Sequence, residues 1–347
     1  MLFTSTRPGL RALAVVPAAA LVLVLTGCSA EEEDKKSSGG AESKGAFPIS
    51  IKNALGTAKI TEQPKRVVTL GHGSTETAIA LGHTPVGMER YEWGSDKTGY
   101  MPWIHEAVTK KGDELPKQFT GGENLDIEAI AELKPDVILA PWSGVTQKQY
   151  DVLTDIAPTV AYPGKAWSTN WDQQIEIVSK ALGKPEQSKV LVKEIEKTFA
   201  DAAASRPEYK KHTFSYIYNT GPGTLGVFRT EEQRVAVVSS LGLKADPVAD
   251  TFKEVEGTDS SLIGLENGNK LAKSDLIFTF YSDEKNRKEI ESQKLYKAIP
   301  AIEKGAVVAG AENPFVTASS MINPLTVPWS IERYLPLIDK AIEKSGK

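Results

Sequence analysis

The sequence predicts an α/β protein built from two similar halves. After residue 47, short apolar strand-like runs alternate with amphipathic helical patterns, an order that favours helices packed on parallel sheets. One helical pattern of unusual length lies near the middle of the chain. On either side of it, two segments follow the same order of helix, aspartate and apolar strand.

Six β-rich runs carry the strand prediction. They are RVVTL (66–70), DVILA (136–140), PTVAY (158–162), HTFSYIY (212–218), DLIFTF (275–280) and AVVAG (306–310). Helical patterns such as LDIEAIAELK and NWDQQIEIVSKALG lie between them, and several end at glycine. Because helical crossovers separate the strands, parallel pairing is expected.

The longest helical pattern covers residues 184–211, with Pro185 near its start and Pro207 near its end. A single helix of that length is a stiff strut between two α/β halves. We therefore expect an N-terminal lobe at 47–183 and a C-terminal lobe at 212–347.

The two halves share a weak internal repeat. Glu128 lies eight residues before Asp136, and Glu266 lies nine before Asp275. In both cases the glutamate opens a short helical pattern and the aspartate opens an apolar strand.

Composition and charge exclude one class of partner. The chain has 347 residues, of which 40% are hydrophobic and 25% charged, which is ordinary for a globular protein and sufficient for two cores. Its formal net charge is −4 and its sequence pI is 5.8, so it has no positive field to neutralise a nucleic-acid backbone.

The N-terminus carries an export signal. Arg7 and Arg11 precede the apolar run at 12–27, which is too short and too rich in small residues for a good membrane-spanning helix, so residues 1–27 are predicted to be a signal peptide. The run ends at Cys28, the only cysteine of the chain, and the stretch resembles a bacterial lipoprotein cleavage box. The resemblance implies that Cys28 is lipidated and holds the protein at the extracytoplasmic face of the membrane. The alternative is a buried or stray thiol.

Residues 28–46 continue from this cysteine as a charged, Ser/Gly-rich segment. It has almost no large apolar side chains to bury, so a flexible tether is predicted, with folded structure beginning near Phe47.

The turn in VVTLGHGSTETAIALG (67–82) matches no familiar catalytic or phosphate-binding motif. It lacks the lysine of a phosphate loop, and Glu76 would repel a pyrophosphate after Gly71 and Gly73. Ser74 also lacks the flanking glycines of a nucleophile elbow. The prediction is a helix start, with Gly73 or Ser74 as N-cap and Glu76 in the first turn.

Four segments in fixed order resemble one protein family. PKRVVTLGHGSTETAIALGHTPVGMERY, LDIEAIAELKPDVILAP, the long central helix and LENGNKLAKSDLIF are similar to the periplasmic-type substrate-binding proteins of iron–siderophore and cobalamin ABC importers. With the tryptophan content and the lipoprotein-like terminus, the chain looks most like actinobacterial ferric-siderophore-binding lipoproteins of the hydroxamate type. The resemblance implies two Rossmann-like lobes joined by a single long α-helix, with a ligand cleft between them.

The same resemblance implies the function. The protein would capture a ferric siderophore and deliver it to an ABC permease, as a monomer, without catalysis and with no resident cofactor. Alternatives are a haem- or cobalamin-binding protein of the same fold, a zinc or manganese receptor, or a hydrolase. The last two are disfavoured, because the four histidines are isolated and no nucleophile motif accompanies them.

In this family an acidic residue on each lobe meets arginines of the permease. The matching positions here are Glu128 and Glu266, which the resemblance implies are docking residues. Alternatively, each glutamate only compensates a helix dipole.

A ferric siderophore fills the coordination positions of its iron, so the protein has to supply aromatic faces and donors rather than metal ligands. Aromatic and arginine residues near predicted strand ends are therefore ligand candidates. They are Arg90, Tyr91, Trp93, Trp142, Trp167, Tyr218, Arg229, Tyr281 and Trp329, with Arg90, Trp142, Arg229 and Tyr281 preferred. Arg234 and Arg333 lie within helical patterns and are expected on solvated faces.

Overall fold

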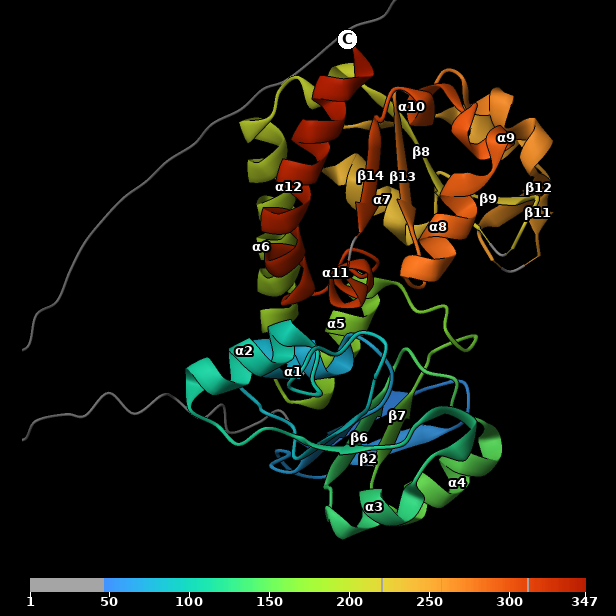
Figure 1. Cartoon of the computed structure of the whole chain (residues 1–347). Coiled ribbons are helices and arrows are strands. Elements are labelled where there is room, and N and C mark those ends of the chain that lie inside the picture. Colours follow the sequence, from blue (N-terminus) through green and yellow to red (C-terminus); the bar gives the residue numbers. More distant parts are fainter. Residues whose placement is uncertain (1–46, 220, 257, 311) are drawn as a thin grey trace, which may run out of the picture. The chain divides into compact units, whose positions relative to one another are not determined.

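The computed structural model describes residues 47–219, 221–256, 258–310 and 312–347. The predicted signal peptide, Cys28 and the tether lie outside these described residues. Within the described ranges, no helix is both long enough and apolar enough to cross a bilayer. Figure 1 shows two lobes, each built around its own sheet.

The first lobe contains, in the described part of the chain, a parallel five-stranded sheet of order β5-β4-β3-β6-β7. Its strands are β3 (Val67–Thr69), β4 (Gly87–Glu89), β5 (Lys117–Phe119), β6 (Val137–Ala140) and β7 (Thr159–Ala161). The helices of this lobe are α1 (Ser74–Ala80), α2 (Pro102–Lys111), α3 (Ile127–Glu132), α4 (Gln147–Ile156) and α5 (Trp171–Ala181), with a 3₁₀ turn at Gly122–Asn124. An antiparallel pair, β1 (Ile49–Lys52) and β2 (Thr57–Ile60), precedes them.

The second lobe has a mixed sheet of seven strands over the described residues, with β11-β12-β9-β8-β13-β14 in line and β10 beside β8. The strands are β8 (Thr213–Tyr218), β9 (Thr224–Phe228), β10 (Lys244–Ala245), β11 (Glu254–Val255), β12 (Ser260–Gly264), β13 (Leu276–Phe280) and β14 (Val307–Gly310). Its α-helices are α7 (Gln233–Ser240), α8 (Glu284–Ser292), α9 (Lys294–Lys297), α10 (Pro300–Glu303), α11 (Asn313–Ala318) and α12 (Thr326–Ser345). Two 3₁₀ helices are η3 (Pro247–Thr251) and η4 (Leu265–Leu271).

The expectation of purely parallel pairing is wrong for part of this second sheet. Strands β8, β13 and β14 are parallel, but β9 pairs antiparallel with both β8 and β12. The short connection after β8 contains Gly221 and Gly223, both at positive φ, and Gly223 adopts the left-handed conformation that a tight turn needs. A turn this short returns the chain as a hairpin, whereas a parallel partner requires a helical crossover.

The long helix predicted over 184–211 is α6 (Pro185–Ser205), followed by a 3₁₀ turn at Tyr209–Lys211. It begins at Pro185, whose fixed φ suits a first helical position, and it ends before Pro207, which disfavours helical backbone at Arg206. Helix α6 packs against α5 and α12, and Figure 1 shows α6 and α12 side by side. The predicted lobe boundaries and the role of this helix as a strut stay predictions.

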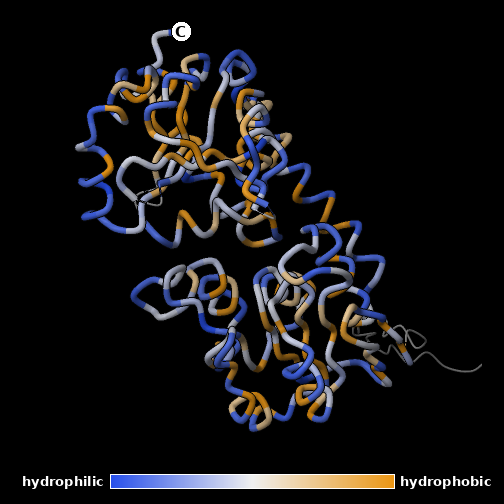
Figure 2. Tube along the Cα trace, turned by 90° about the vertical axis from the view of Figure 1, so that its right-hand side faces the viewer, coloured by the Kyte–Doolittle hydropathy of each residue, from blue (hydrophilic) through white to orange (hydrophobic). Residues whose placement is uncertain are grey.

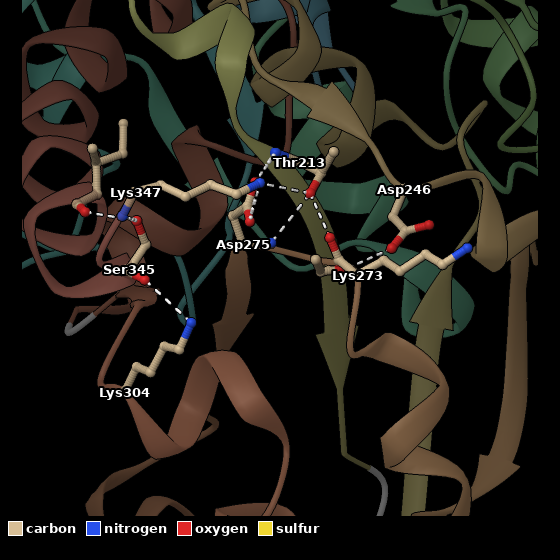
Figure 3. A network of polar contacts seen from close by, with 9 residues as sticks. Thr213, Asp246, Lys273, Asp275, Lys304, Ser345 and Lys347 are labelled. Atoms are coloured by element: carbon tan, nitrogen blue, oxygen red, sulfur yellow. Dashed lines mark hydrogen bonds and ion pairs between the residues drawn. The ribbon is translucent and has the colours of Figure 1, made fainter.

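The internal repeat has a structural basis. Asp136 accepts hydrogen bonds from the backbone N–H groups of Lys65 (2.8 Å) and Arg66 (3.0 Å), just before β3. Asp275 accepts from the backbone N–H of Thr213 (2.9 Å) and from its hydroxyl (3.1 Å), at the start of β8 (Figure 3). Asp136, just before β6, therefore holds the start of the neighbouring strand β3. In the same way Asp275, just before β13, holds the start of the neighbouring strand β8.

The apolar residues of both sheets are buried. Figure 2 shows hydrophobic stretches running through the interior of each lobe, with hydrophilic segments around them. A smaller apolar cluster joins the lobes, because Ile79, Met88 and Trp103 of the first lobe pack with Ala318 and Trp329 of the second. The Trp103 and Trp329 ring centroids are 5.5 Å apart.

Candidate functional site

A cavity of about 300 Å³ is lined by residues of both lobes. The first lobe contributes the turn before α1, the loop after β4, the loop after β6 and α5. The second lobe contributes the start of α7, the end of β13, α11 and the segment that leads into α12. The lining residues are His72, Gly73, Trp93, Trp142, Gln174, Glu232, Gln233, Arg234, Phe280, Val316, Thr317, Ser320, Met321, Ile322 and Asn323.

A groove of about 360 Å³ continues this cavity, because the two share Trp142, Gln233 and Ile322 as lining residues. Trp167 and Trp171 line the groove from the first lobe. We call the cavity and the groove together the interlobe cleft. Its combined size and its aromatic walls suit a bulky organic ligand better than a bare ion.

The turn before α1 forms part of the cavity wall, and its glycines are required there. Gly71 and Gly73 have φ of +72° and +85°, and a Cβ on Gly71 would collide with the backbone carbonyl of Trp142. Gly73 is the N-cap of α1, as one of the two predicted alternatives had it.

Glu76 in the first turn of α1 is 1% exposed. Its carboxylate accepts hydrogen bonds from the backbone N–H of Gly73 (3.1 Å) and from the Trp103 indole (2.9 Å). Burial raises the pKa of Glu76, although these hydrogen bonds oppose the shift. The residue thus ties α1 to α2 behind the cavity wall.

A row of aromatic rings leads from the cavity into the groove. Tyr91 stacks on His72 with ring centroids 3.8 Å apart, His72 lies 5.5 Å from Trp142, and Trp142 meets Trp167 edge-on at 4.7 Å. Burial lowers the pKa of His72 to about 4, so this imidazole is neutral near pH 7. Trp93 and Trp167 are 45% and 47% exposed as residues, so both present apolar surface at the cleft.

The cationic side chain of the cavity is Arg234. It lies in the first turn of α7, with its guanidinium 4.8 Å from the centroid of the Phe228 ring and 5.9 Å from that of Phe280. Its Nη1 pairs with the Glu232 carboxylate. The expectation that Arg234 solvates a helix face is wrong, because α7 begins only at Gln233 and its first turn faces the cavity.

Three of the residues that line this cavity carry a buried polar atom without a hydrogen-bond partner. In the described part of the chain, Nδ1 of His72, Nε of Arg234 and Nδ2 of Asn323 belong to this class. Buried polar groups in folded proteins nearly always have partners. All three atoms belong to residues that line the cavity, and acceptor oxygens of a ligand would satisfy the two N–H donors.

The structure brings together part of the predicted ligand set. Trp93 and Trp142 line the cavity, Trp167 lines the groove, and Tyr91 lies behind His72. The other five candidates have protein partners and do not line the cavity or the groove. They are Arg90, Tyr218, Arg229, Tyr281 and Trp329.

Arg90, Arg229 and Tyr218 each have a nearby protein partner outside the cleft. The Arg90 guanidinium lies 3.6 Å from the Glu92 carboxylate. Nη1 of Arg229 donates to the carbonyl of Phe252 at 3.4 Å, and the hydroxyl of Tyr218 lies 2.9 Å from that of Ser260.

Tyr281 and Trp329 are the remaining two candidates, and strand alternation and interlobe packing explain why they lie outside the cleft. Phe280 lines the cavity, so Tyr281 turns to the other side, where its hydroxyl lies 3.0 Å from that of Tyr296. Trp329 packs against the interlobe apolar cluster, and its indole donates to Glu106 at 3.3 Å.

The two predicted docking glutamates are exposed on separate lobes. Glu128 lies in the first turn of α3, and Glu266 lies in the first turn of η4. Glu128 precedes Asp136 and Glu266 precedes Asp275, so the two glutamates occupy corresponding places in the internal repeat.

Among the residues that the structure describes, no group of three or more histidine, cysteine, aspartate or glutamate side chains is arranged to hold a metal ion.

Known proteins share both the sequence and the fold. A family model described as periplasmic binding protein matches residues 67–314. The probable siderophore-binding lipoprotein YfiY of Bacillus subtilis is 27% identical over 300 residues, which cover 82% of this chain and 85% of that protein. The crystal structure of Streptococcus pneumoniae PiaA in complex with ferrichrome is 31% identical, with a TM-score of 0.74 over 85% of this chain and 99% of PiaA. Staphylococcus aureus SirA complexed with staphyloferrin B is 26% identical, with a TM-score of 0.62 over 85% of this chain and 98% of SirA.

The family model spans well over half of the chain, and the two-lobe α/β fold of PiaA is present here. The chain therefore belongs to the periplasmic binding protein family.

Proposed function

We propose that the protein is the solute-binding component of an ABC importer and that it captures a ferric siderophore of the hydroxamate class in the interlobe cleft. The similarity to PiaA in complex with ferrichrome supports this class of ligand, and the similarity to YfiY supports a siderophore. Its action is binding and presentation, without a chemical step.

The presence of unpartnered donors and aromatic faces on residues of one cavity carries the proposal. Arg234 and Asn323 line the cavity, and each carries a buried N–H donor, Nε and Nδ2, that has no protein partner and that a ligand oxygen would satisfy. Trp93 and Trp142 offer flat apolar surfaces to the organic shell. A ferric siderophore needs both features and no metal ligand from the protein.

Tryptophan fluorescence tests this function directly. Four of the six tryptophans, Trp93, Trp142, Trp167 and Trp171, line the interlobe cleft. The full-length protein in detergent is titrated with ferric hydroxamates, ferric catecholates, haemin, cobalamin and zinc. Saturable quenching by a ferric hydroxamate is the expected result, whereas a response to haemin or cobalamin alone would overturn the ligand.

The proposal extends to the membrane and the permease. Lipidation at Cys28 would hold the receptor at the outer face of the cell membrane, in keeping with the lipoprotein name of YfiY. Glu128 and Glu266 would meet arginines of the permease, one from each lobe, and so fix the docking orientation. Their exposure and their corresponding places in the repeat support this role.

A further inference from the structure

We propose that the interlobe cleft selects ferric complexes by charge, admitting neutral and cationic ferric hydroxamates and rejecting anionic ferric complexes, and that Glu232 is the residue that sets this selectivity. The inference rests on the proposed function and narrows its ligand.

The cavity offers no unpaired positive charge among its described lining residues. Arg234 is its cation, and the Glu232 carboxylate pairs with Nη1 at one edge of the guanidinium. Glu232 is 8% exposed, so this ion pair is largely removed from water. The arginine that would attract an anionic ligand is therefore already neutralised.

Glu232 is also held in place by the backbone. As the N-cap of α7, its carboxylate accepts a hydrogen bond from the backbone N–H of Arg234 at 2.7 Å. An anionic ligand that took the guanidinium would leave this buried carboxylate without its counter-charge, which is costly. A neutral ligand carries no charge that competes with Glu232 for the guanidinium, so it leaves the ion pair intact.

The groove adds further negative charge. Its described lining residues include Asp172, Glu231 and Asp259 and no lysine or arginine. Over cavity and groove together, the lining carries four carboxylates and one guanidinium. Carboxylates that face a ligand repel anions and favour neutral or cationic partners.

This field separates the classes of ferric complex. Three hydroxamates carry three negative charges, which balance those of Fe³⁺, so a ferric trihydroxamate is neutral and becomes cationic with a pendant ammonium. Ferric citrate and ferric tris-catecholates keep a net negative charge. The former class fits the cleft without breaking the Glu232–Arg234 pair.

The test compares three probes on the full-length protein: ferrichrome (neutral), ferrioxamine B (cationic) and ferric citrate (anionic). The wild-type protein is expected to bind the first two at least about tenfold tighter than ferric citrate. Glu232→Gln keeps the helix cap but frees the guanidinium, so the affinity for ferric citrate should rise about tenfold relative to the affinity for ferrichrome. Glu343→Gln, which removes the same charge at the exposed C-terminal end of α12, is the matched control and should change neither.

Two further measurements keep the assignment open to refutation. The gain for ferric citrate should disappear in the double variant Glu232→Gln/Arg234→Gln, because it depends on the freed guanidinium. In the wild-type protein, added salt should tighten ferric citrate binding by screening repulsion and should leave ferrichrome binding unchanged, a result that requires no variant to fold.

Each outcome has a distinct meaning. Equal wild-type affinity for ferrichrome and ferric citrate would overturn charge selection while the proposed function stands. A folded Glu232→Gln protein without a gain for ferric citrate would remove Glu232 from the role. No binding of any ferric complex would overturn both the proposed function and this inference.

Discussion

Replacing Arg234 should weaken siderophore binding far more than replacing Arg229. Arg234 lines the cavity and has an unpartnered Nε, whereas Arg229 is bonded to the Phe252 carbonyl away from it. A hydrogen bond to a charged donor contributes about 1.5–3 kcal/mol, so Arg234→Ala is expected to raise the Kd for ferrichrome about 10- to 150-fold. Arg229→Ala should leave that Kd within about twofold.

The same substitution should make stability depend more on pH. Burial raises the pKa of Glu232, and the charge of Arg234 opposes that shift. Without the guanidinium, the folded-state pKa of Glu232 rises further above its unfolded value, so the ionised carboxylate destabilises the fold. Arg234→Ala should therefore lose little free energy of unfolding below the unfolded pKa of glutamate and progressively more as pH rises through the folded pKa.

Fluorescence titration measures the two affinities, and chemical denaturation at pH 4 and pH 8 measures the stability change. Arg234→Lys is the informative companion, because it keeps the charge beside Glu232 but not the planar donor. It should recover the stability at pH 8 and only part of the affinity. A loss of ferrichrome binding in Arg229→Ala with none in Arg234→Ala would show that the ligand lies elsewhere.

Three other expectations follow from the site and its supports. Glu128→Ala and Glu266→Ala should leave ferrichrome affinity intact and slow ferric-siderophore uptake by cells, and a loss of affinity in either would contradict their docking role. Trp103→Phe removes the indole donor to buried Glu76 and should cost about 1–3 kcal/mol of unfolding free energy at pH 8. The cost should be smaller at pH 4, because the raised pKa of Glu76 favours its neutral form there. Chemical denaturation at the two pH values measures the difference. Because Trp103 and Trp329 already pack across the lobes, solution scattering should show only a small decrease in radius of gyration on ligand binding, and a large one would refute that expectation.

Much of the fold was predictable because its strands are continuous apolar runs. The six predicted runs correspond to β3, β6, β7, β8, β13 and β14, each within a residue or two of its observed ends. The antiparallel strands β9 and β12 were not predicted. The direction of β9 depends on a hairpin turn around Gly221 and Gly223, and strand periodicity carries no information about direction.

The site was less predictable, because one-residue differences decide which side chain faces the cleft. Trp93 and Trp142 line the cavity, and their place in loops at the carboxyl ends of parallel strands is what makes them ligand candidates in the sequence. Sequence reasoning favours Tyr281 and Arg229 as ligand residues, whereas Phe280 and Arg234 line the cavity. Glu232 carries a sequence signal for the position of Arg234. A glutamate just before a helical pattern is a possible N-cap, which places Arg234 in the first turn of α7 rather than on a solvated face.

The two sides of the interlobe cleft differ in how firmly their aromatic residues are held, and this difference affects how a ligand is enclosed. On one side, Trp103 is fixed by Glu76 below and by Trp329 of the other lobe, so the lobes already share a buried apolar contact. At the groove, Trp167 is 47% exposed and holds a left-handed backbone conformation, with φ of +60°, that non-glycine residues rarely adopt. Rotation of the lobes would break the contact between Trp103 and Trp329. We therefore expect the ligand to be enclosed by rearrangement of the groove around Trp167, where little buried surface would be lost.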